Sequence, residues 1–212
     1  MVRSRALRLG VLLSGGGRTL ENLFKEIDAG RLTTEVVVVI ADRADAFGLE
    51  RAKKRGIQTH LIERENYPST ASFSEAIADV LRNLDVELVA MAGFLALWKI
   101  PKDFIHRVMN IHPALLPAFG GKGFYGERVH RAVHRSGVRF TGCTVHFAND
   151  EYDAGPIILQ AVVHLDQGDT VKDIARKVFE AECDTYPKAI RLFAEGRLTV
   201  RGSRVEIRES TD

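Results

Sequence analysis

The chain has 212 residues, of which 45% are hydrophobic and 27% are charged, so it can bury a core of ordinary size. Its 30 Lys and Arg residues and 28 Asp and Glu residues leave a net charge of +2, which argues against a dedicated nucleic-acid-binding protein. Two cysteines without a CxxC pair exclude a disulfide framework, and no apolar run has transmembrane length. We therefore expect a cytoplasmic protein with no metal, no nucleic-acid partner and no membrane partner.

Apolar runs and amphipathic stretches alternate through the first half of the chain. The expected strands span 7–14, 35–42, 57–62, 86–94 and 106–112. The expected helices are one capped by Thr19 and ended by Gly30, one over 45–56, and one with a capping box at Ser72 and Glu75. This order predicts an α/β fold with a doubly wound, mostly parallel sheet and right-handed crossovers.

The pattern changes after Pro117, where "AFGGKGFYG" predicts a mobile glycine-rich loop. The remaining expected elements are a helix over 127–137, paired and antiparallel strands over 142–150 and 156–165, a long helix over 170–196 and a terminal hairpin turning at Gly202. We expect one domain over 1–212, with a first half over 1–105 and a second half over 106–212.

The stretch "LLSGGGRTLENL" joins a strand to a helix through three glycines. Backbone amides at a helix start bind anions, and glycine lets a phosphate approach closely. Gly15 and Gly17 fit a dinucleotide fingerprint, with Asp42 as its ribose-binding acid, but Leu20 replaces the third glycine. A single phosphate is therefore the favoured ligand, and a tight turn without a ligand is the alternative.

Asn110 and His112 lie two residues apart, so they share one strand face near the carboxyl end of the strand, just before Pro113. Asp153 lies in a turn before the next strand, and His146 lies within a strand. An imidazole beside a carboxylate can carry a proton, and an amide can stabilise an oxyanion, which suits attack of an amine on an acyl group. Each residue alone could equally be a hydrogen-bonded structural group.

The segments "SGGGRTL", "ADAFGLERA", "AGFLALW", "NIHPALLP", "GCTVHF" and "DEYDAGPIILQ" occur in this order. Together they resemble the phosphoribosylglycinamide formyltransferase family, over about residues 8–200. The resemblance implies a Rossmann-like formyltransferase fold and transfer of a formyl group from 10-formyltetrahydrofolate, as co-substrate, to the amine of glycinamide ribonucleotide in purine synthesis. The first half would bind the nucleotide phosphate, and the second half would hold the catalytic and folate-binding groups.

The resemblance also implies roles for individual residues. Asn110 and protonated His112 would stabilise the oxyanion of a tetrahedral intermediate, Asp153 would keep His112 charged, and His146 would support them. The implied substrate-binding residues are Gly16, Gly17, Arg18, Thr19, Gly93, Pro113 and Glu182, of which Glu182 would bind the ribose hydroxyls.

The implied folate-binding residues are Phe94, Leu95, Ala96, Leu97, Trp98, Ala148, Asn149 and Asp150. The side chains of Leu95, Leu97 and Trp98 would form apolar walls for the pterin. Ala96 stands where family members often carry an arginine that pairs with the glutamate tail. Lys99, Lys122 and Arg64 are the alternative anchors.

Other functions remain open at this point. A formyltetrahydrofolate hydrolase, a methionyl-tRNA formyltransferase and a sugar-nucleotide formyltransferase share the superfamily motifs, but all are usually longer. A nucleotide-binding module without catalysis is the alternative from another class. We expect a monomer or a homodimer.

Overall fold

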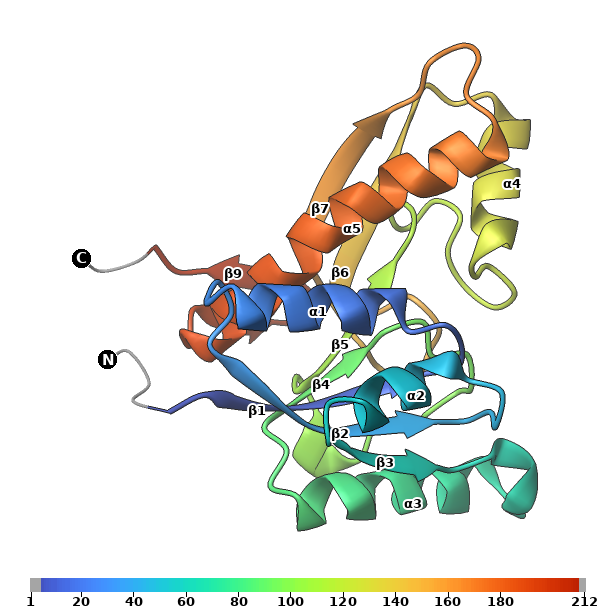
Figure 1. Cartoon of the computed structure of the whole chain (residues 1–212). Coiled ribbons are helices and arrows are strands. Elements are labelled where there is room, and N and C mark those ends of the chain that lie inside the picture. Colours follow the sequence, from blue (N-terminus) through green and yellow to red (C-terminus); the bar gives the residue numbers. More distant parts are fainter. Residues whose placement is uncertain (1–4, 210–212) are drawn as a thin grey trace. The chain divides into compact units, whose positions relative to one another are not determined.

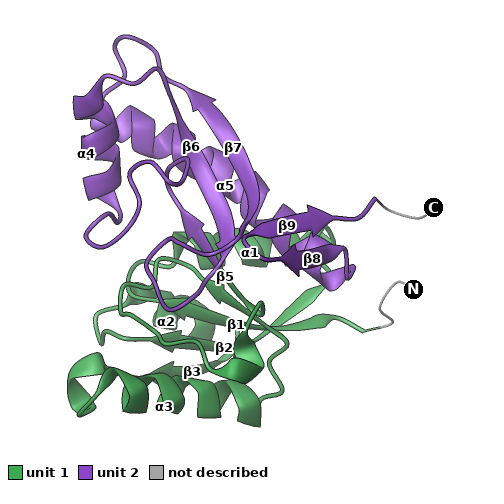
Figure 2. Ribbon diagram, turned by 180° about the vertical axis from the view of Figure 1, so that it is seen from behind, with its two compact units in different colours: residues 1–109 green, residues 110–212 purple. Residues whose placement is uncertain are grey.

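The structure is a computed structural model that describes residues 5–209. The chain divides into two compact units, one ending at Met109 and the other beginning at Asn110 (Figure 2). This boundary falls close to the one expected between 105 and 106. The expectation of a single domain stays a prediction.

The first unit is an α/β layer structure. Its elements are β1 (Leu7–Leu13), α1 (Arg18–Asp28), β2 (Thr34–Ala41), α2 (Phe47–Lys53), β3 (Gln58–Leu61), the 3-10 turn η1 (Arg64–Asn66), α3 (Thr70–Asn83), β4 (Leu88–Met91) and the 3-10 turn η2 (Lys102–Phe104). The strands are parallel and follow the order β3-β2-β1-β4. Figure 1 shows α3 on the opposite side of these strands from α1, so both faces are covered.

The apolar runs became strands because both faces of the sheet are buried. Leu9, Val11 and Leu13 in β1 have no exposed surface, and neither does Leu12 on the other face. Gly10 is needed between them, because a Cβ there would lie 2.7 Å from Cδ2 of Leu81 on α3. The missing side chain therefore lets α3 pack closely on β1.

Two helix starts differ from the expectation. The cap of α1 is Gly17, with φ +70°, rather than Thr19, because the turn needs a left-handed residue before the helix begins. The cap of α3 is Ser69, which shares a capping box with Ser72, so Ser72 lies inside the first turn rather than before it.

The second unit begins within β5 (Val108–His112), which crosses the boundary between the units. Its other elements are α4 (Glu127–Ser136), β6 (Phe140–Phe147), β7 (Ile157–His164), α5 (Val171–Ala194), β8 (Leu198–Arg201) and β9 (Arg204–Ile207). The strand order is β5-β6-β7-β9-β8, with antiparallel pairing of β6 with β7 and of β8 with β9. The long helix α5 packs against β6, β7 and α4.

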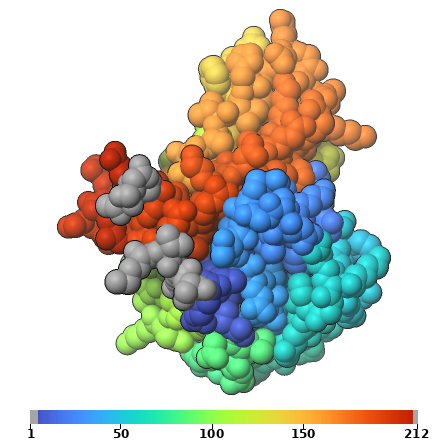
Figure 3. All heavy atoms as spheres, turned by 60° about the vertical axis from the view of Figure 1, so that its left-hand side comes forward, coloured from blue at the N-terminus to red at the C-terminus, as the bar shows by residue number. Residues whose placement is uncertain are grey.

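The expected fold class is confirmed: a mostly parallel α/β sheet, an antiparallel C-terminal extension and a long C-terminal helix. The expected hairpin is also present, and Gly202 turns it with φ +60°. Its side chains are mostly exposed, and Figure 3 shows them in red at the surface. Within residues 5–209, none of the helices is both long and apolar enough to cross a membrane.

His130 is a buried polar residue on α4 that the sequence analysis did not single out. It is 8% exposed, and its Nδ1 has no hydrogen-bond partner within the described part of the chain. Burial lowers the pKa of His130, the charge of His112 lowers it further, and Glu127 opposes both. The folded protein therefore resists protonation of this imidazole.

A substitution at Gly142 in β6 tests the close approach of β7. An added Cβ would overlap the carbonyl oxygen of Ala161 and lie 2.8 Å from Cδ2 of Leu115. We expect Gly142→Ala to lower the free energy of unfolding by about 2–3 kcal/mol, measured by urea denaturation. Gly168→Ala is the control, since nothing lies within 4 Å of its added Cβ. Equal stability of the two variants would contradict the packing described.

The buried imidazole of His130 predicts a pH dependence of stability. Because its folded pKa lies below its unfolded value of about 6.5, unfolding takes up a proton as the pH falls through that value. We expect the free energy of unfolding to fall as the pH is lowered from about 8 to about 5.5. The free energy of unfolding of the His130→Gln variant should fall less over the same interval. Urea denaturation at both pH values measures this, and equal losses in the two proteins would refute it.

Candidate functional site

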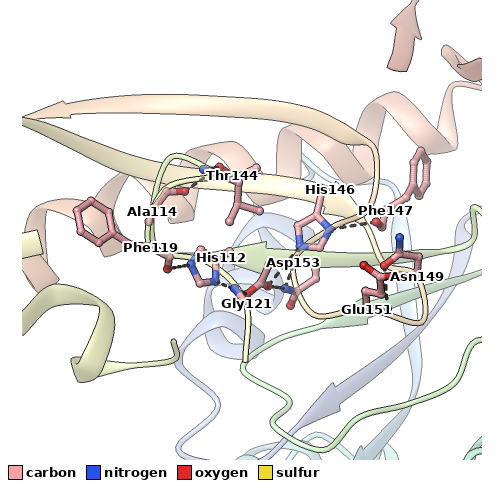
Figure 4. Close-up of polar contacts among 12 residues, drawn as sticks. His112, Ala114, Phe119, Gly121, Thr144, His146, Phe147, Asn149, Glu151 and Asp153 are labelled. Atoms are coloured by element: carbon pink, nitrogen blue, oxygen red, sulfur yellow. Dashed lines mark hydrogen bonds and ion pairs between the residues drawn. The ribbon is translucent and has the colours of Figure 1, made fainter. Parts of the chain in front are cut away.

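The second unit brings together four of the polar residues expected from the sequence. His112 lies in β5, His146 lies in β6, and Asp153 lies in the turn that follows β6 (Figure 4). Asn110, two residues before His112, shares its face of β5. The turn returns closely to β6, since a Cβ on Gly155 would overlap the carbonyl oxygen of Phe147. Strand alternation and this tight turn therefore build the cluster.

The carboxylate of Asp153 is the centre of this cluster. Its Oδ2 accepts a hydrogen bond from the backbone N–H of Gly121 at 2.9 Å and lies 3.4 Å from Nδ1 of His112. Its Oδ1 accepts from Nδ2 of Asn110 at 3.3 Å and lies 3.7 Å from Nε2 of His146. Only 10% of the Asp153 side chain is exposed, so these neighbours replace most of its water.

The hydrogen bonds of Asn110 and His146 fix their orientations. Nδ1 of His146 donates to the carbonyl oxygen of Phe147 at 3.0 Å, because a carbonyl can only accept. Its Nε2 accepts from Nδ2 of Asn110 at 3.1 Å, because an amide nitrogen can only donate. Both amide protons of Asn110 are therefore directed into the cluster, one to His146 and one to Asp153.

His112 is held between two acceptors. Its Nε2 donates to the carbonyl oxygen of Phe119 at 2.8 Å, and its Nδ1 faces Asp153. Burial lowers the pKa of His112, and the charge of Asp153 offsets part of that effect. The net effect is a pKa below the usual value of a histidine, which favours the neutral imidazole at neutral pH.

Asp153 carries a negative charge at neutral pH. Burial acts to raise its pKa, but the neighbouring His146, the charge of His112 and the N–H of Gly121 outweigh it, so the pKa lies below its usual value. The backbone of Asp153 has φ +56° and that of Phe119 has φ +55°, both uncommon for residues with side chains. Such geometry is often found where a protein holds functional groups in place.

The glycine loop belongs to the first unit, where α2 holds it. A Cβ on Gly17 would lie 2.7 Å from Cα of Gly48, and N of Gly48 donates to O of Gly15 at 3.0 Å. Arg51 on α2 donates from Nε to O of Gly16 at 2.8 Å and pairs with Glu21 at 2.9 Å. The loop lies at the start of α1, as expected, with Arg18 and Thr19 in the first turn of that helix.

The segment 93–98 lies beside the end of β1 in the first unit. Ser14 donates from its backbone N to O of Gly93 at 3.0 Å and accepts at Oγ from N of Leu95 at 2.8 Å. N of Ala96 donates to Oδ2 of Asp42 at 3.2 Å. Burial raises the pKa of Asp42 despite this bond and one from Ser14. Asp42 therefore supports this segment.

The expected role of Trp98 as an apolar wall is not supported. Trp98 is 2% exposed and its Nε1 donates to O of Ser74 at 3.0 Å, so it packs in the core. Phe94 is also buried, at 7% exposed, and stacks near Phe73. Leu95, at 38% exposed, remains available to contact a ligand.

The other expected residues occupy separate places in the second unit. Pro113 ends β5, and Asn149 stabilises the 148–153 turn by accepting from N of Glu151 at 3.1 Å. Ala148 and Asp150 lie in the same turn. Glu182 lies on α5. Burial raises the pKa of the Cys143 thiol to about 11, and the charge of Glu182 contributes to this rise.

Sequence reasoning missed three groups that support these sites. Arg51 belongs to "ADAFGLERA", but nothing in that motif indicates a contact with the glycine loop. Phe119 and Gly121 act through backbone atoms, which no side-chain pattern reveals. Gly120 and Gly121 were the sequence feature that could have indicated a close backbone approach at this position.

Comparisons with known proteins agree on one family. Residues 7–190 match the formyl transferase family. The phosphoribosylglycinamide formyltransferase of Haemophilus influenzae is 35% identical over 92% of this chain and 90% of that protein. The trifunctional purine biosynthetic protein adenosine-3 of Gallus gallus is 38% identical over 94% of this chain, which spans only 20% of that protein.

A solved structure supports the same assignment. Glycinamide ribonucleotide transformylase 1 from Symbiobacterium toebii is 44% identical, with a TM-score of 0.90 over 98% of this chain and 96% of that one. The match over nearly the whole chain, and the profile match to residues 7–190, lead to one conclusion: this chain belongs to the formyl transferase family.

Proposed function

We propose that this chain transfers the formyl group of 10-formyltetrahydrofolate to the amine of glycinamide ribonucleotide, as in purine biosynthesis. The observation that supports this proposal best is the buried Asp153 carboxylate, in contact with both Asn110 and His112. The similarity to phosphoribosylglycinamide formyltransferases supports the choice of substrates. The enzyme would act in the cytoplasm on small molecules, as a monomer or a homodimer, by a route that uses no metal.

In the proposed reaction, the amine nitrogen bonds to the formyl carbon, and the bond from that carbon to the folate nitrogen then breaks. The proton lost by the amine passes, through a water beside Asp153, to the departing folate nitrogen. Asn110 and His112 would stabilise the negative oxygen formed between these steps. No side chain forms a bond to the formyl group.

The donors for that oxygen are engaged within the protein in the present arrangement. Nε2 of His112 donates to Phe119, and the amide protons of Asn110 are directed to His146 and Asp153. The substrate oxygen would take the place of the Phe119 carbonyl as the acceptor from His112. Nδ1 of His112 would continue to face Asp153, which stabilises the imidazolium.

Other residues would bind the nucleotide and the folate. Gly16, Gly17, Arg18 and Thr19 offer backbone amides at the start of α1 to a phosphate. Glu182 would bind the ribose hydroxyls. Segment 93–98 and the turn 148–153 would contact the folate, chiefly through backbone groups and Leu95.

The direct test is a formyl transfer assay with synthetic glycinamide ribonucleotide and 10-formyltetrahydrofolate. Mass spectrometry should detect the formylated nucleotide, and omission of the nucleotide should leave the formyl donor intact. Equal release of formate with and without the nucleotide would identify a hydrolase. Absence of any turnover, with the ligands bound, would identify a binding module.

Replacement of Asp153 tests the centre of the proposed mechanism. We expect Asp153→Asn to lower kcat about 10²- to 10⁴-fold, because a neutral amide cannot stabilise the His112 imidazolium. The fold should survive, since asparagine tolerates the positive φ of this residue. Glu65→Gln, at an exposed position outside the proposed binding sites, is the control. Wild-type turnover by the Asp153 variant would refute the proposed joint role of Asn110, His112 and Asp153.

Replacement of Gly17 tests the glycine loop. We expect Gly17→Ala to raise the KM for glycinamide ribonucleotide about tenfold or more, because its Cβ displaces the loop from Gly48. The KM for the folate should change little, as measured by varying each substrate at saturation of the other. Gly15→Ala, with open space around its Cβ, is the control. A larger effect on the folate would reassign the loop.

A further inference from the structure

The polar contacts of segment 119–121 with His112 and Asp153 are made by its backbone. The carbonyl oxygen of Phe119 accepts from His112 at 2.8 Å, and the N–H of Gly121 donates to Asp153 at 2.9 Å (Figure 4). The two groups belong to different peptide units, 119–120 and 120–121. The Phe119 carbonyl can therefore yield to a substrate oxygen while the Gly121 N–H stays on Asp153.

The Gly121 contact is the shortest polar contact of the Asp153 carboxylate among the described residues. The contacts from Asn110, His112 and His146 measure 3.3, 3.4 and 3.7 Å. A short N–H bond to a carboxylate favours the charged form and fixes the direction of the accepting oxygen. It also leaves Oδ1 turned toward Asn110.

We propose that Gly121 is a positioning residue, whose backbone N–H fixes the orientation and the negative charge of Asp153. The importance of that charge for catalysis rests on the proposed function. Glycine is required here because φ is +91°, outside the region that side-chain-bearing residues readily adopt. A residue with a Cβ must relieve this strain by turning the backbone, which withdraws the N–H from Asp153.

Gly123 provides a matched control two residues away. Its φ is +95°, and an added Cβ would meet nothing within 4 Å, as at Gly121. Among the described residues, however, the backbone donor to Asp153 is Gly121 and not Gly123. Alanine at either position therefore introduces similar strain into the same loop, and only one position loses the bond.

Steady-state kinetics across pH compare the two variants. We expect Gly121→Ala to lower kcat about tenfold or more, with both KM values near those of the wild type. The acid limb of its kcat profile should move up by about one pH unit, because Asp153 loses a stabilising donor. Gly123→Ala should keep the wild-type profile, and Gly121→Asn should recover part of the activity, since asparagine tolerates positive φ.

Similar losses in the two alanine variants, without a shift of the acid limb, would overturn the proposal, because loop strain alone would explain them. Wild-type behaviour of Gly121→Ala would overturn it as well.

A measurement without substrate separates this proposal from the proposed function. In an NMR pH titration of the ligand-free protein, the amide proton of Gly121 should shift as Asp153 ionises, and Asp153→Asn should abolish that shift. The midpoint should move upward in Gly121→Ala. A protein inactive in formyl transfer but with this titration would refute the function and support the positioning role. An active protein whose Gly121 amide does not titrate would support the proposed function and refute the positioning role.

Discussion

The charge on Asp153 is the constraint on which the rest of the site depends. A carboxylate with only a tenth of its side chain exposed must exchange water for protein donors, or it loses its charge. The second unit supplies these donors from β5 and from the loop at 119–121. The alternation of β5, the tight return of the turn at Gly155 and the glycine conformation at 121 all serve that requirement.

A similar logic organises the first unit, where uncharged backbone groups are held in place. The ends of β1 and β2 deliver Ser14 and Asp42 to one edge, and both hydrogen bond to the segment 93–98. Helix α2 approaches the glycine loop closely enough that Gly17 must lack a side chain, and Gly48 lacks one because Leu13 of β1 lies against it. Arg51 then fixes a loop carbonyl. Backbone amides held this way cost little reorganisation when an anion binds.

The sequence predicted the layer order, because buried parallel strands appear as unbroken apolar runs such as that of β2. It also placed Asn110 and His112 on one face, because successive side chains of a strand point to opposite faces. It placed the cap of α1 at Thr19, whereas the cap is Gly17, because the left-handed backbone angle that decides the cap is not visible in the sequence. Nor could it separate a core Trp98 from a ligand-facing one, because both are apolar. The Gly121 contact joins residues 32 apart through a backbone atom, beyond any local pattern.

The opposing effects of burial and Asp153 on His112 explain how this arrangement would favour a transition state over bound substrate. Burial disfavours the imidazolium and outweighs the attraction of Asp153, so the pKa of His112 is lowered and the neutral form is favoured in the resting protein. A negative oxygen forming beside Nε2 adds a second attraction and shifts the balance toward the charged form. The attraction therefore grows as the reaction proceeds, which is the condition for acceleration rather than tighter substrate binding.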